Sequence, residues 1–330
     1  MIDAELLHVL REGHIDCVHR GRVVLLNAAE TVLYERGQSH GVVFMRSLAK
    51  PFQAQAVVAS GAADHFGFSP AELALISGSH NGSSEQAQII AAMLDKIGLP
   101  LSALGCGAST PIDRKTAEQL VRDGQKPTAL HHPCSGKHTG MLAICRAKGW
   151  DTSGYTHADH PVQRYITDLM KTVLALSDDQ CLLALDGCSV PTYGVPLYNV
   201  ALGFARLGVA VRTQENTPAA RIASALQANP LLYSGQRRMD SALMMTTHSR
   251  LIAKDGTEGI LALAVPEKSI GLAIKISDGS SRAIMPVVVQ LLRAYGCLSD
   301  DEASALRAQF PEDLAIHTGA VASHLHPLTA

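Results

Sequence analysis

Ser47 and Lys50 have the spacing of a serine nucleophile and its lysine base. The segment Ser47-Leu48-Ala49-Lys50 would place both side chains on one helical face, because positions i and i+3 share a face. A serine attacks only after a base takes its proton, and a lysine can be that base when desolvation or nearby cations favour the neutral amine. Helix interiors exclude Pro51, so the pair is expected at a first helical turn, where the dipole favours a developing anion. Alone, the pattern is common, and a solvated helix start is the simpler interpretation.

Two further motifs favour a catalytic role for Ser47. Ser79-His80-Asn81 has the form S-x-N, and Lys254-Asp255-Gly256 has the form K-x-G. The order S-x-x-K, S-x-N, K-x-G is that of β-lactamases and penicillin-binding proteins. The second motif follows the first sooner than in a β-lactamase. Together the three motifs make serine acyl transfer a serious interpretation beside the solvated helix start.

Cys134, Lys137 and Cys188 are candidate metal ligands. Cys134 and Lys137 open an expected helix, and Asp186-Gly187-Cys188 follows an expected strand. Two thiols could bind Zn²⁺, and a neutral lysine amine could complete three protein ligands with one open position. Lysine is a rare zinc ligand, however, and buried cysteines are more often simple hydrophobic residues. The residues alone therefore favour a structural role.

The composition excludes several other classes of function. The chain has 330 residues, 47% of them hydrophobic, with a net charge of −2 and no basic stripe, which argues for a globular protein without a nucleic-acid partner. No apolar run approaches the roughly 18 residues that span a bilayer, and the N-terminus lacks a secretion signal. The seven cysteines are scattered and do not suggest a disulfide framework. We expect a cytoplasmic protein with reduced thiols and no membrane partner.

Hydrophobic periodicity predicts the elements that position these residues. Strands are expected at 17–20 and 23–27, joined by a turn at Gly21, and at 41–45. A short buried strand is expected at 181–185, and further strands at 251–254, 260–265 and 270–276, the last two forming a hairpin. Helices are expected at 52–59, ending at Gly61 as a C′ residue, from the capping box that begins at Ser69, and at 84–96, 111–122, 137–148, 161–176 and 282–295.

Strands at both ends and helices in the middle predict an α/β (α+β) fold of the serine-β-lactamase or penicillin-binding-protein type. One antiparallel sheet would be assembled from both chain ends, flanked by helices, with a helical lobe inserted. The sheet-containing part would be 1–45 and about 250–330, and the mainly helical part about 46–249. No linker-like run divides them, so residues 1–330 are expected to form a single catalytic unit.

Several longer strings resemble one enzyme family, the class 3 or rhizobial-type L-asparaginases. The resemblance runs from about residue 18 to residue 286. It rests on five segments: Arg46-Ser47-Leu48-Ala49-Lys50-Pro51-Phe52-Gln53, Ser77-Gly78-Ser79-His80-Asn81, His132-Pro133-Cys134-Ser135-Gly136-Lys137-His138, Asp186-Gly187-Cys188 and Lys254-Asp255-Gly256-Thr257-Glu258-Gly259.

The resemblance implies a serine-β-lactamase-like fold, a homodimer, and hydrolysis of L-asparagine to L-aspartate and ammonia. It also implies two Ser–Lys tandems, Ser47 with Lys50 and Ser79 with Lys254. A zinc site of Cys134, Lys137 and Cys188, with Asp186 close by, is implied in the same way, and it reverses the structural interpretation of these cysteines.

Amide hydrolysis needs a nucleophile, an oxyanion stabiliser and a proton for the departing ammonia. We assign Ser47 as the nucleophile and Lys50 as its base, with Ser79 and Lys254 relaying protons, although the two serines could exchange roles. Zinc would orient the α-amino and α-carboxylate groups of the substrate rather than activate water, because a serine nucleophile makes a zinc hydroxide redundant.

Further candidate substrate contacts are Arg46, which could equally be a structural ion-pair partner, and His80, Asn81 and Asp186. Two other functions remain open. One is a β-lactamase-like serine esterase or peptidase, and the other is a non-catalytic zinc-binding protein on the same fold.

Overall fold

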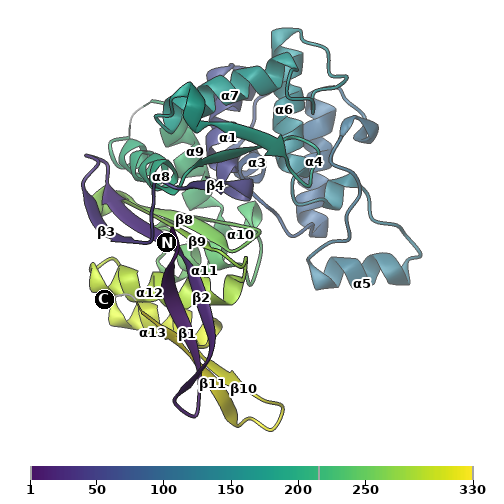
Figure 1. Cartoon of the computed structure of the whole chain (residues 1–330). Helices are drawn as coiled ribbons and strands as arrows, with labels where there is room; N and C mark the ends of the chain where they lie inside the picture. The colour runs from purple at the N-terminus through teal and green to yellow at the C-terminus, as the bar shows by residue number, and fades with distance from the viewer. Residues whose placement is uncertain (1, 215, 329–330) are drawn as a thin grey trace. The chain divides into compact units, whose positions relative to one another are not determined.

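The computed structural model describes residues 2–214 and 216–328. The chain forms two compact units, each assembled from more than one segment (Figure 1). The sheet unit comprises Met1–Leu48, Val195–Val209 and Ala242–Ala330, and the helical unit comprises Ala49–Gly194 and Ala210–Ser241. The expectation that the whole chain works as one catalytic unit stays a prediction.

The sheet unit holds an antiparallel sheet in the order β10-β11-β1-β2-β9-β8-β7, with β3 on β2. Strands from both chain ends meet at its centre, because the C-terminal β11 pairs with β1 and the late strand β9 pairs with β2 (Figure 1). This topology confirms the predicted fold class. The strands are β1 (Ala4–Arg11), β2 (His14–Asn27), β3 (Val32–Arg36), β7 (Ile252–Gly256), β8 (Ile260–Val265), β9 (Ile270–Ile276), β10 (Asp313–Ala315) and β11 (Val321–Pro327).

Helices cover this sheet closely. β8 is apolar and buried along its whole length, as expected for a strand packed on both faces. A Cβ at Gly271 of β9 would overlap the Ala201 carbonyl of α8 (Leu197–Arg212), so glycine is what lets that helix lie against the sheet. A second helix, α12 (Ile284–Ala294), contacts β9, β11 and α13 (Asp300–Gln309).

The prediction of a hairpin turn near the start of the chain was wrong. The expected turn at Gly21 does not exist, because β2 runs through it without interruption. Gly21 is required for a different reason, since a Cβ there would overlap the Lys275 carbonyl of β9. The true hairpin turn is at Glu12 and Gly13, both with positive φ. The helix expected at 282–295 is α12, and α13, β10 and β11 follow it along the chain.

The helical unit follows the predicted helices closely. α4 (Ser84–Lys96) has the expected bounds, α3 (Pro70–Ser77) begins at the predicted Ser69 capping box, and Gly61 and Gly149 have the left-handed φ expected after a helix. α5 starts at Arg114, three residues later than expected, because Asp113 caps it through the Thr116 amide. The other helices are α1 (Lys50–Ala59), α2 (Ala62–His65), α6 (Ser135–Lys148), α7 (Pro161–Val173), α9 (Pro218–Ala228) and α10 (Pro230–Tyr233), and α11 (Met239–Thr246) leads out of the unit.

The core of this unit is built around α1 and α6. Both are buried over most of their length, and α1 contacts α3, α6, α7 and α9. Gly136 and Gly140 of α6 lie so close to Leu75 and Ile76 of α3 that a Cβ at either glycine would collide with that helix. Small residues therefore fix the end of α3 against the start of α6, which carries Lys137.

A β-hairpin of β5 (Leu182–Leu185) and β6 (Pro191–Pro196) lies in the helical unit up to Gly194. The prediction of a buried strand at 181–185 was wrong in its burial, because all four residues of β5 are exposed, whereas β6 is buried. A continuous apolar run does not distinguish a central strand from an edge strand. Across residues 2–214 and 216–328, no helix has the length and apolar character needed to cross a bilayer.

Candidate active site

Lys50 and Ser79 form a buried amine–hydroxyl pair in the helical unit. Lys50 is the first residue of α1 and is 1% exposed, and Ser79 follows α3 and is 3% exposed. The Lys50 Nζ donates to Ser79 Oγ at 2.7 Å and to the Pro133 carbonyl at 3.2 Å. As a neutral amine, the same nitrogen could accept a hydroxyl proton at this distance. The geometry therefore suits a lysine that exchanges a proton with a serine.

The loop that carries Ser79 is held by close backbone contacts. A Cβ at Gly78 would overlap the Tyr233 carbonyl, and one at Gly82, which has a φ of +72°, would press on the His131 carbonyl. The loop therefore needs glycine on both sides of Ser79, and its path is fixed by backbone at both ends. Sequence analysis missed the Pro133 and Tyr233 carbonyls, because a backbone contact leaves no signature in the side chains that provide it.

His80 uses both ring nitrogens within the protein. The Gly82 amide donates to Nδ1 at 3.0 Å, so Nε2 carries the proton and donates to Ser135 Oγ, 2.8 Å away. Burial, together with the nearby Lys50 charge, lowers the pKa of His80 to about 3. The neutral ring therefore links the Ser79 loop to the start of α6 through these two hydrogen bonds.

Asn81 is turned so that its amide nitrogen faces the protein. Nδ2 donates to the Gln236 carbonyl at 3.2 Å, and the backbone carbonyl accepts from the Asp113 amide at 2.9 Å. The side-chain oxygen Oδ1 is buried and has no hydrogen-bond partner among the described residues. It is an acceptor without a donor at the edge of the candidate site.

The sheet unit carries Arg46, Ser47 and Lys254. Ser47 lies in a 3-10 helix, Arg46–Ala49, that leads directly into α1, and Arg46 has a φ of +49°, a strained value for a residue with a side chain. A Cβ at Gly256 of β7 would lie 3.0 Å from Leu48 Cδ1, so this segment lies against the strand that carries Lys254.

Lys254 is fully buried and paired with a carboxylate that sequence analysis did not single out. Its Nζ lies 3.0 Å from Asp255 Oδ1. The only sequence signal for this partner was its place inside the K-x-G motif. Lys50 and Ser79 belong to one unit and Ser47 and Lys254 to the other, and the expected tandems Ser47–Lys50 and Ser79–Lys254 stay predictions.

Cys134, Lys137 and Cys188 converge in the helical unit. Lys137 Nζ lies 3.1 Å from Cys188 Sγ, and Asp186 Oδ2 lies 3.7 Å from the same sulfur. Cys134 is near enough to Lys137 for the two charges to interact. Cys134 and Lys137 stand at the start of α6, and Cys188 stands in the turn before β6, where Ser189 has a φ of +70°. The structure thus brings together all three predicted ligands.

The charges in this cluster favour one thiolate and one ammonium. The hydrogen bond from Cys188 holds the pKa of Cys134 well below its usual value, with help from Lys50 and Lys137, and the same bond raises the pKa of Cys188. Burial lowers the pKa of Lys137, but the facing sulfurs Cys188 and Cys134 outweigh it, so the net shift is upward. A cation therefore already faces a sulfur anion here.

This donor set suits a thiophilic metal such as zinc. Two sulfurs and one amine nitrogen give three ligands and leave a fourth position open, the arrangement of catalytic rather than structural zinc sites. Within residues 2–214 and 216–328, no three His, Cys, Asp or Glu side chains form a metal-binding group. Any zinc site would therefore depend on the lysine.

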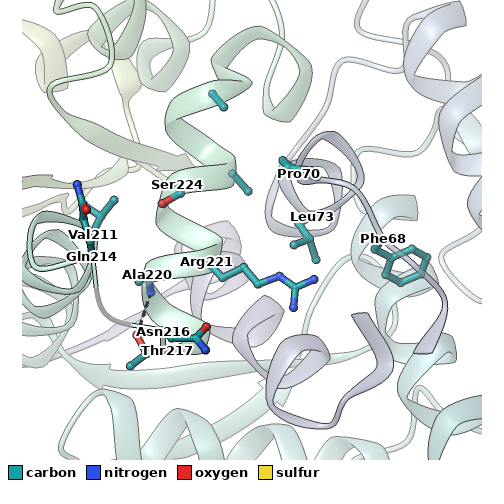
Figure 2. A pocket seen from close by; sticks show the side chains of 12 residues that line it. Phe68, Pro70, Leu73, Val211, Gln214, Asn216, Thr217, Ala220, Arg221 and Ser224 are labelled. Carbon is teal, nitrogen blue, oxygen red and sulfur yellow. Dashed lines mark hydrogen bonds between the residues drawn. The ribbon is translucent and has the colours of Figure 1, made fainter. Parts of the chain in front are cut away.

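A groove elsewhere in the helical unit contains none of the candidate residues. It has a volume of about 610 Å³ and lies between α9 and the start of α3, with the Arg221 side chain extended across it (Figure 2). Arg221 Nη1 donates to Asp64 at 2.5 Å. Phe68 and Leu73 are among the apolar residues that line it.

A family model described as L-asparaginase II matches residues 7–327. No curated protein matches the chain. Among solved structures, a β-lactamase from Mycobacterium bovis is 14% identical, with a TM-score of 0.43 over 83% of this chain and 94% of its own. The LovD6 mutant of simvastatin synthase from Aspergillus terreus is 10% identical, with a TM-score of 0.37 over 88% of this chain and 92% of its own. Since the family model spans nearly the whole sequence, the chain belongs to the L-asparaginase II family.

Proposed function

We propose that this protein is an L-asparaginase of the class 3, rhizobial type, which hydrolyses L-asparagine to L-aspartate and ammonia by Ser–Lys acyl transfer. The observation that carries the proposal is the buried contact of 2.7 Å between Lys50 Nζ and Ser79 Oγ, in a chain of the L-asparaginase II family. A buried lysine that contacts a hydroxyl and a carbonyl is a group that can move protons.

The proposed reaction has two halves. Ser47 Oγ forms a bond to the side-chain carbonyl carbon of asparagine, and its proton passes to Lys50. The tetrahedral intermediate then expels ammonia, which takes the proton held by Lys50 through Ser79, and leaves an aspartyl ester on Ser47. Water attacks this ester, L-aspartate departs, and the serine regains its proton.

Three features support these roles. The strained backbone at Arg46 directly precedes Ser47, and such strain is concentrated at functional sites. Ser79 receives a hydrogen bond from Lys50, so it is placed to relay the proton that Lys50 takes up. Lys254, ion-paired with Asp255, is proposed to supply positive charge to the Ser79 relay.

Cys134, Lys137 and Cys188 are proposed to hold Zn²⁺. When bound, the ion supplies a Lewis-acid position for the α-amino and α-carboxylate groups of the substrate. The two sulfurs and the amine must lose their protons to hold it. Asp186, whose Oδ2 lies 3.7 Å from Cys188 Sγ, is proposed to contact the substrate beside this site. A homodimer in the cytoplasm remains the expected state of the enzyme.

Ammonia release from L-asparagine tests the proposal. The wild type should release ammonia, and Ser47→Ala should lose activity by several orders of magnitude while keeping its fold, because a single hydroxyl is removed. If Ser79→Ala abolishes activity and Ser47→Ala does not, the serines exchange roles. If both variants stay active, the serine mechanism is wrong. Turnover of a chromogenic β-lactam or a short ester without ammonia release would support an esterase or peptidase, and zinc content without any turnover would support a binding protein.

A further inference from the structure

Residues 233–241, which we call the brace, are closed on themselves by buried hydrogen bonds. Ser234 Oγ donates to Asp240 Oδ1 at 2.5 Å, and Ser241 Oγ donates to the Gly235 carbonyl at 2.5 Å. The Ser241 amide donates to the same Asp240 oxygen at 2.9 Å. Ser234, Asp240 and Ser241 are all at most 1% exposed. One carboxylate oxygen therefore ties the two ends of the brace together.

The closed brace contacts the Ser79 loop on both sides of the serine. On one side, the Tyr233 carbonyl lies where a Cβ of Gly78 would be. On the other side, the Gln236 carbonyl accepts from Asn81 Nδ2, and Gly235 has a φ of +134° and no room for a side chain beside the Asn81 amide. The brace thus contacts the residues on both sides of Ser79.

We propose that Asp240 is a positioning residue, which closes the brace and thereby holds Ser79 Oγ against Lys50 Nζ. This inference rests on the proposed function, in which Ser79 relays protons. A local role is the alternative, because Asp240 stands in the first turn of α11, where a carboxylate stabilises a helix dipole. The two roles differ in what they predict for residues 77–83, which a local helix contact would leave unchanged.

Ser234→Ala separates the two roles, because it removes the hydrogen bond from Ser234 to Asp240 and leaves the Asp240 carboxylate and its contact with the Ser241 amide in place. The bond from Ser241 to the Gly235 carbonyl also stays, so the variant tests the Asp240 link alone. We expect amide hydrogen exchange in residues 77–83 to become about tenfold faster. We expect kcat for L-asparagine to fall about 10- to 100-fold with a smaller change in KM, because small displacements of a reacting group cost that much. Asp240→Asn, which keeps an oxygen acceptor, should keep near wild-type values, whereas Asp240→Ala should show the same losses as Ser234→Ala.

Ser299→Ala is the matched control. Ser299 caps α13 in the sheet unit through the Glu302 amide, so its loss should lower the melting temperature and leave exchange at 77–83 unchanged. Wild-type exchange at 77–83 in Ser234→Ala would overturn the inference, and so would faster exchange with an unchanged kcat. If Asp240→Ala does not fold, Ser234→Ala decides alone. If the wild type does not hydrolyse asparagine, the proposed function fails, while the exchange rates still decide whether the brace holds the loop.

Discussion

At the residue scale, the contact between Lys50 and Ser79 is the feature that sequence analysis could not supply. Helical spacing predicted that Lys50 pairs with Ser47, three positions away, because a short motif carries information on local geometry alone. Ser79 reaches Lys50 across 29 positions of chain, through a loop whose path depends on Gly78 lying against Tyr233. The residue types were therefore predictable, and their pairing required the fold.

Also at the residue scale, His80 should make stability depend on pH. Its folded pKa is lowered to about 3 by burial, whereas an unfolded histidine binds a proton below about pH 6.5. The unfolded state therefore binds more protons between these values, and stability is lost as pH falls through that window. In His80→Gln, which cannot titrate, the free energy of unfolding should fall less between about pH 7 and about pH 5 than in the wild type.

Urea unfolding at the two pH values measures this difference. The wild type and His80→Gln should each be compared with themselves across pH, so that any loss of packing in the variant cancels. An equal pH dependence in both proteins would show that His80 is protonated in the folded state, and the neutral tautomer assigned to it would be wrong.

At the scale of elements, a zinc ion would join the start of α6 to the turn before β6. If the ion positions the substrate head group, its removal by a chelator should raise KM more than it lowers kcat, because ground-state binding is lost. Cys134→Ser and Cys188→Ser should reproduce this effect and should not add to it, because all three changes act on one site. A fall in melting temperature without a change in KM would indicate a structural ion. Absence of zinc by elemental analysis would show that these residues do not form a zinc site.

The elements themselves were predicted well where the signal is local. The capping box at Ser69 and the periodicity of residues 84–96 depend on neighbours in sequence, and α3 and α4 begin where these signals place them. Gly21 was misread because its cause is distant, namely the Lys275 carbonyl of another strand. The prediction that β5 is buried was wrong for the same reason, because whether a strand lies at an edge depends on the whole sheet.

At the scale of the whole molecule, the sheet unit depends on the C-terminal strand. β11 pairs with β1 from Leu7↔Pro327 to Leu10↔His324, and its Leu325 is 2% exposed whereas Val321 is 58% exposed. Leu325→Ala should lower the free energy of unfolding by about 2–4 kcal/mol through loss of core packing. Val321→Ala, on the same strand, should change it by less than about 0.5 kcal/mol. Equal effects in denaturant unfolding would mean that β11 does not contribute to the core.

In the proposed mechanism, hydrolysis passes through a serine-bound acyl intermediate. Acid quenching during turnover of L-asparagine, followed by proteolysis and mass mapping, tests it most directly. We expect an aspartyl ester on the peptide that contains Ser47, present in the wild type and absent from Ser47→Ala. Release of ammonia with no aspartyl group on any serine would show that the serine mechanism is wrong, because water would then attack the amide directly.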